Sequence, residues 1–110
     1  MIDWNRITEL RDEVGVEDFG EVVELFLEEV DEVIERLETT GDRTKLEQDL
    51  HFLKGSSMNL GFASFSSLCQ TGEIASADGH SDAVDLAEIL ASYKISRAEF
   101  TSKTDIILSS

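Results

Sequence analysis

The chain has 110 residues, 41% of them hydrophobic, and no proline, which is enough for one domain with a modest core. Its 24 acidic residues against 9 basic ones give a net charge of −15, which argues against binding to nucleic acid or to an anionic membrane surface. The N-terminus resembles no signal peptide, and no apolar run approaches the ~18 residues of a membrane span. We therefore expect one cytoplasmic domain, residues 1–110, although a soluble domain cut from a longer chain would look the same.

Apolar residues at helical spacing predict two helices in the first forty residues. The first is short, begins near Asp3 and has one apolar face made of Ile7, Leu10 and Val14. Gly15 separates it from a long second helix, from about Glu17 to Glu38. Its apolar face recurs at steps of three and four: Phe19, Val22, Phe26, Val30, Val33 and Leu37.

Three more helices follow, separated by turns at residues 39–45 and 78–82. Asp42 is the predicted N-cap of the third helix, and Gly61 the residue that ends it. The faces of these three helices are Leu46, Leu50, Leu53, Ser57 and Leu60; Phe65, Leu68, Gly72 and Ala75; and Leu86, Leu90, Tyr93, Arg97, Phe100 and Ile107. Because the connections are short, we expect an all-α protein, an antiparallel four-helix bundle with a short N-terminal capping helix.

The third helix places a histidine outside its apolar face. At about 100° per residue, His51 lies some 140° from the centre of the leucine stripe, so it faces solvent. Gly55, one turn on, also faces outward, although glycine inside a helix costs roughly 0.5–1 kcal/mol relative to alanine. The pattern continues to Leu60, so Gly55 does not end the helix. We infer that another molecule comes close to the backbone beside His51.

Charge favours the approach of an anion to this helix. Residues 41–60 hold three acids and three bases, whereas residues 1–40 carry a net charge of −11 and residues 61–110 one of −4. A neutral imidazole is a good nucleophile near pH 7. A phosphoryl group needs positive charge near its oxygens, which Lys54 can supply, and an approaching protein needs clearance, which Gly55 can supply. The pattern thus fits phosphoryl transfer to and from His51.

The segment HFLKGSSMNLG, residues 51–61, resembles the signature of histidine-containing phosphotransfer (HPt) domains, His-x-Leu-Lys-Gly-Ser-Ser-x-x-Leu-Gly. The helices before and after it, EDFGEVVELFLEEVDEVIERL and LCQTGEIA, resemble the family's as well. The resemblance implies a four-helix bundle that shuttles phosphoryl groups, with His51 as phosphoacceptor, Lys54 as electrostatic support and Gly55 as clearance. Glu73 stands where relatives carry a polar side chain that bonds the imidazole, in some of them a glutamine. Its charge would repel a phosphoryl group while fixing the tautomer.

The function predicted from this resemblance is that of a histidine phosphocarrier in a two-component phosphorelay. It would accept a phosphoryl group from a receiver-domain aspartate or a hybrid histidine kinase and pass it to a response regulator. The chain has no glycine-rich nucleotide loop, so we expect no ATP site, no metal site of its own, and Mg²⁺ in the partner receiver domain. We expect a monomer. Two alternatives remain open: the phosphoacceptor domain of a histidine kinase, and a helical adapter that binds receiver domains without phosphorylation.

Several side chains near or outside this segment have plainer interpretations. Phe52 and Met58 lie outside the leucine stripe and could form an apolar docking patch, although Phe52 could equally pack against a neighbouring helix. Ser57 faces the core, where we expect it to bond a carbonyl one turn earlier. Cys69 is expected to be a core residue rather than a redox centre, and His80 an exposed residue without a role.

Overall fold

The computed structural model describes residues 2–109, and side chains as far as residue 103. It contains α1 (Trp4–Val14), α2 (Val16–Thr40), α3 (Leu46–Asn59), α4 (Ala63–Ala77), a 3₁₀ turn η1 (Ser81–Ala83) and α5 (Leu86–Ser109). The predicted all-α class is confirmed. Ile107, predicted to belong to the apolar face of the last helix, lies outside the residues whose side chains are described. In the described part of the chain, no helix is both long and apolar enough to cross a membrane.

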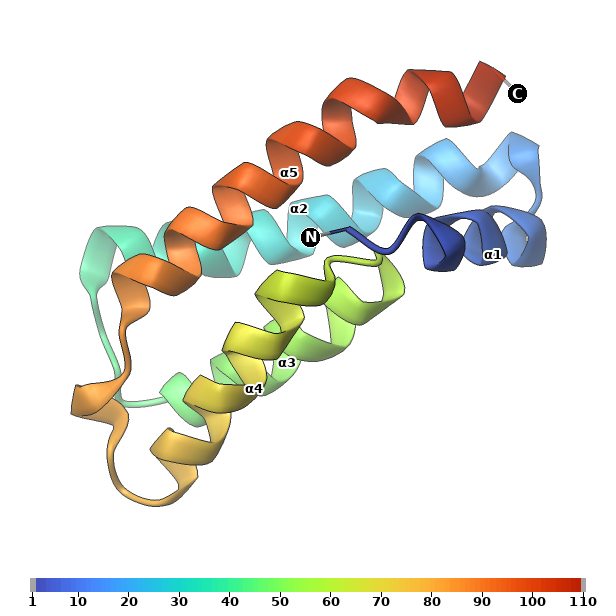
Figure 1. The fold of residues 1–110 in the computed structure, drawn as a ribbon. Coiled ribbons are helices and arrows are strands. Elements are labelled where there is room, and N and C mark those ends of the chain that lie inside the picture. Colours follow the sequence, from blue (N-terminus) through green and yellow to red (C-terminus); the bar gives the residue numbers. More distant parts are fainter. Residues whose placement is uncertain (1, 110) are drawn as a thin grey trace.

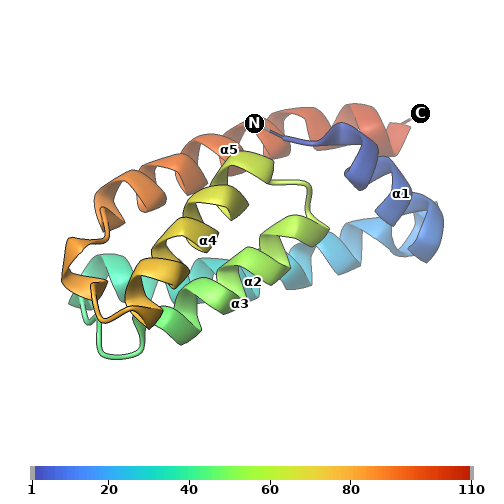
Figure 2. The ribbon, with the colours of Figure 1, turned by 60° about the horizontal axis from the view of Figure 1, so that its bottom comes forward.

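The four longer helices run alternately up and down, as short connections require (Figure 1). The long helices α2 and α5 lie antiparallel, and α3 and α4 form a shorter hairpin beside them (Figures 1 and 2). Helix α1 covers the end where α2 begins and α5 ends (Figure 1). Of all pairs of helices, α3 and α4 pack most extensively. The bundle is elongated, about 45 × 23 × 19 Å.

The core is built from the predicted helix faces, with one adjustment. The α3 face is buried throughout, from Leu46 to Leu60. In α2 the fully buried residues include Val23 and Ile34, whereas the predicted Val22, Phe26 and Val33 are only half-buried. This helix contacts α1, α3 and α5, so its buried face is wider than a single stripe. The same holds in α5, where Ile89 and Ser96 are buried while Leu90 and Arg97 are half-buried.

Two local predictions fail on hydrogen bonding. The Asp42 carboxylate accepts from the Thr44 amide at 2.9 Å, inside the turn, and the N-cap residue of α3 is Lys45. An aspartate readily bonds the amide two residues on, which uses Asp42 before the helix begins. Ser57 is buried as expected, but its Oγ has no hydrogen-bond partner among the described residues, so the bond to a carbonyl one turn earlier is absent.

The turn between α3 and α4 needs glycine at its middle position. Gly61 has φ +72°, and a Cβ there would lie 2.5 Å from the carbonyl oxygen of Asp3. The Asp3 amide donates to the Gly61 carbonyl at 2.6 Å, and the Asp3 carboxylate caps α1 by accepting from the amides of Asn5 and Arg6. Gly61 therefore ends α3, as predicted, and lets the N-terminal segment lie against this turn.

A charged cluster joins α2 to α5. Arg97 donates to both carboxylate oxygens of Asp31, from Nε at 2.9 Å and from Nη2 at 2.8 Å. The Tyr93 hydroxyl donates to the same carboxylate. Burial raises the pKa of Asp31, but the hydrogen bonds from Arg97 and Tyr93 outweigh it and hold the pKa below the ordinary value. The ionised carboxylate is thus part of what holds the two long helices together.

We predict that Asp31→Asn lowers the free energy of unfolding at pH 7 by about 1–2 kcal/mol, a modest loss because the cluster is partly exposed. A lowered pKa stabilises the fold above the pKa of an unfolded aspartate, about 3.9, and this gain is lost as the pH falls through the folded-state pKa. The difference between wild type and variant, measured by urea denaturation, should therefore shrink as the pH falls below about 3.9. Glu35→Gln, on an exposed position of the same helix, is the control. A difference that persists unchanged at pH 3 would contradict the charge argument.

Candidate functional site

His51 lies midway along α3 with 74% of its side chain exposed. The leucine face of α3, including the neighbouring Leu50 and Leu53, is turned to the core and fully buried. The periodicity of the helix therefore forces His51 outward, which confirms the exposure predicted from the sequence.

Glu73, on α4, reaches His51 across the helix pair. Both of its carboxylate oxygens lie 3.1 Å from the imidazole Nδ1, and its side chain is only 14% exposed. A carboxylate can only accept, so Nδ1 carries the proton in this contact. Nε2 is then the ring nitrogen with the lone pair, and no described residue bonds to it. The structure thus places Glu73 beside His51, where the resemblance put it.

Lys54 binds the same carboxylate. Its Nζ donates to the two oxygens of Glu73 at 3.0 and 3.2 Å, so one carboxylate serves two donors. Burial raises the pKa of Glu73, but the hydrogen bonds and charges of Lys54 and His51 outweigh it and leave the pKa below its ordinary value. Glu73 is therefore ionised at neutral pH, and it holds both side chains in place.

Gly55 lies on an open surface. A Cβ added there would meet nothing within 4 Å, and the same is true of Gly20 in α2. Gly72 differs, because a Cβ there would lie 2.8 Å from Leu50 Cδ1 and 3.2 Å from Val84 Cγ1. Packing within the chain therefore explains the glycine at position 72 but not the one at position 55.

Phe52 and Met58 follow His51 on the same helix, one and seven residues after it. Phe52 is 36% exposed and Met58 59% exposed. Each borders a shallow hollow. The hollow at Phe52 is lined by α2 side chains as well: Glu29, Glu32, Val33 and Arg36. Phe52 thus packs toward α2 and remains accessible, and its role in docking stays a prediction.

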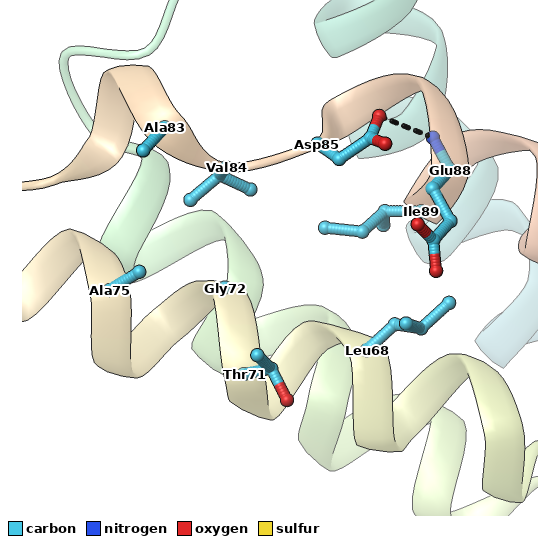
Figure 3. Close-up of a pocket in the computed structure, with 9 residues that line it drawn as sticks. All are labelled: Leu68, Thr71, Gly72, Ala75, Ala83, Val84, Asp85, Glu88 and Ile89. Atoms are coloured by element: carbon cyan, nitrogen blue, oxygen red, sulfur yellow. Dashed lines mark hydrogen bonds between the residues drawn. The ribbon is translucent and has the colours of Figure 1, made fainter.

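A separate cavity of about 210 Å³ lies between α4, η1 and α5, away from His51 (Figure 3). Its walls are mostly apolar, with Gly72, Val84 and Ile89 facing one another (Figure 3). The Asp85 carboxylate at its edge already accepts from the Glu88 amide at 3.1 Å, at the start of α5. Its lining offers no convergent polar groups for a ligand, so we assign it no function.

The remaining reactive side chains do not form a site. Cys69 is fully buried, and burial, followed by the charge of Glu73, raises the pKa of its thiol to about 12. His80 is exposed in the turn after α4. Among the described residues, no group of three or more histidine, cysteine, aspartate or glutamate side chains could hold a metal ion.

Sequence reasoning missed two ion pairs near the site. It predicted that Lys54 would serve the phosphoryl group, but not that Glu73 holds it in the unmodified protein. It also missed the pair between Arg36 of α2 and Asp49 of α3, at 2.6 Å. The signal available for the Lys54–Glu73 pair was the opposite charge of two residues at the edges of adjacent helix faces.

We predict that Gly55→Ala and Gly20→Ala each raise the free energy of unfolding by about 0.5–1 kcal/mol, because alanine favours the helix and both positions are open. Gly72→Ala should lower it by about 1–3 kcal/mol, because the added methyl group overlaps Leu50. Urea denaturation of the three variants tests this. A loss of stability in Gly55→Ala would show that the glycine serves the fold after all.

The family comparison agrees with this geometry. The family model described as the Hpt domain matches residues 21–98, which is more than half of the chain. Comparisons with curated proteins and with solved structures give no significant match. The chain therefore belongs to the Hpt domain family, whose members carry out histidine phosphotransfer in phosphorelays and interact with receiver domains and kinases.

Proposed function

We propose that this chain is a phosphocarrier that accepts a phosphoryl group on Nε2 of His51 from a receiver-domain aspartate or a hybrid histidine kinase and passes it to a response regulator. The observation that carries the proposal is the exposed imidazole of His51, bonded through Nδ1 to the ionised Glu73. That bond fixes the tautomer and turns the nucleophilic nitrogen to solvent. As a phosphocarrier of this family, it would work in the cytoplasm, and we propose that it is a monomer.

In the transfer step, the lone pair of Nε2 forms a bond to phosphorus while the bond from phosphorus to the aspartate oxygen breaks. The electron pair of that bond leaves with the aspartate carboxylate. The positive charge of Lys54 lies one turn away and lowers the cost of bringing the phosphoryl oxygens to α3. The partner receiver domain would supply Mg²⁺, and this chain would supply no ATP site.

Gly55 keeps the surface low beside the reacting nitrogen. A partner must bring its phosphoryl group in line with Nε2, about 3–3.5 Å from it, before transfer can occur. Since a Cβ at position 55 would meet no atom of this chain, the space it would fill is open to the partner. Phe52 and Met58, both accessible on α3, would be the apolar anchors of the docked receiver domain.

We predict that His51→Gln abolishes phosphotransfer and leaves the fold intact, because the side chain is exposed and carries the reacting nitrogen. The measurement follows acid-labile label from phosphorylated receiver domains and Mg²⁺ onto the protein, with circular dichroism as a check of folding. Binding of receiver domains without any transfer to the wild type would instead support the adapter function.

Gly55→Ala should slow the same transfer at least tenfold. Gly20→Ala, also within a helix but remote from His51, should not change the rate of transfer.

We predict that Phe52→Ala and Met58→Ala weaken docking more than they slow the chemical step. Truncating an anchor at the centre of an interface typically costs about 1–2 kcal/mol or more, which is roughly tenfold or more in affinity. The concentration of receiver domain that gives half-maximal transfer should rise accordingly, with the maximal rate nearly unchanged. Ile95→Ala removes another exposed apolar side chain, on α5, and should leave both quantities unchanged. An equal effect of all three variants would refute a docking site around His51.

A further inference from the structure

The group that holds Nδ1 of His51 is a carboxylate, and it is shared with a lysine. We propose that Glu73 keeps the phosphorylated imidazole protonated at Nδ1 through neutral pH. The protonated ring is a good leaving group, so the phosphoryl group remains transferable to a partner. This inference rests on the proposed function, because it concerns the phosphorylated state of His51. It assigns Glu73 a role in passing the group on, beyond orienting the ring for attack.

The role follows from the electron balance of the transfer. When Nε2 forms its bond to phosphorus, the ring loses a lone pair and becomes positively charged, provided that Nδ1 keeps its proton. When the phosphoryl group moves on, the bonding pair returns to Nε2 and a neutral imidazole leaves. If the Nδ1 proton has been lost in between, the leaving group is an imidazolate anion, which is far more basic and leaves far more slowly. Whether Nδ1 keeps its proton therefore decides whether the phosphoryl group is transferred readily or stays on the ring.

A carboxylate retains that proton better than an amide would. Each oxygen of Glu73 lies 3.1 Å from Nδ1, and an opposite charge at such a distance shifts a titration by 1–3 pH units in favour of the charged form. The ring is exposed and the water around it screens the charge, so the lower end of this range applies. Lys54, bonded to the same two oxygens, favours the ionised form of Glu73, which keeps the carboxylate an acceptor, although the positive charge of Lys54 itself opposes the ring cation.

The other charges around the ring come from three helices. On α3, Glu47 lies one turn before His51 and Lys54 one turn after it, and on α4 the charged group is Glu73 itself. On α2, Arg36 pairs with Asp49 of α3 at 2.6 Å, and Glu29 and Glu32 line the hollow beside Phe52. Only Glu73 bonds the ring among the described residues. Glu73 therefore favours the ring cation directly, whereas Lys54 opposes it.

The test loads the full-length protein with phosphoramidate, which transfers its phosphoryl group to Nε2 and releases ammonia, so that no partner protein is needed. Two quantities are then measured between pH 5 and 9: the titration of the phosphorylated ring by ¹⁵N NMR, and the rate at which label is lost to water. Glu73→Gln, nearly isosteric, should lower the midpoint of both profiles by about one pH unit, which makes hydrolysis at pH 8 several-fold to tenfold slower. Glu47→Gln removes an equal charge from the neighbouring turn and should move the midpoint much less.

Lys54→Gln provides the opposite perturbation. Removing the cation frees the carboxylate for the ring, so the midpoint should rise. A merely structural role for Glu73 would change rates at every pH equally and leave the midpoint in place, and that result would overturn the inference. Failure of phosphoramidate to label the wild type, while a known phosphocarrier is labelled in parallel, would instead overturn the proposed function. Circular dichroism of each variant separates both results from unfolding.

Discussion

The close approach of α3 and α4 at Leu50 and Gly72 is the constraint on which the site depends. A side chain at position 72 would overlap Leu50, so glycine is what lets the two helices come this near. The residues that follow Leu50 and Gly72 in the chain are His51 and Glu73, which therefore meet just outside the core at 3.1 Å. A packing requirement within the hydrophobic core thus sets the distance between an exposed histidine and its carboxylate.

On the outer face of α3, several residues are not those that would make the isolated protein most stable. Alanine at position 55 would stabilise the helix and disturb no neighbour, yet the chain keeps glycine there. Phe52 and Met58 leave apolar area of the same helix in water. Each choice is unfavourable for the isolated molecule and favourable for one that a partner covers. These departures from the most stable sequence cluster around His51, as expected of an interaction face.

Much of this could be predicted from the sequence because it depends on local periodicity. The leucine stripe of α3 alone fixes that Leu50 and Leu53 are buried and that His51 is not. Predictions failed where several weak interactions compete. The Asp42 carboxylate can accept a hydrogen bond either inside a turn or at the start of a helix. The path of the surrounding chain determines that it accepts from the Thr44 amide. Likewise, Lys54 and Glu73 are separated by 19 residues, and their bond requires the helix pairing to be known.

Under the proposed function, the pairing of Lys54 with Glu73 would bear on both acceptance and release of the phosphoryl group. In the unmodified protein, the two charges cancel, so the imidazole lies in a nearly neutral environment and keeps its lone pair on Nε2. An incoming phosphoryl group brings two negative charges, which compete with Glu73 for the ammonium of Lys54. If the phosphoryl oxygens drew Lys54 away from Glu73, the carboxylate would lose its other partner and bind the ring proton more strongly. The carboxylate would then stabilise the cationic ring at the moment when the phosphoryl group must be able to leave.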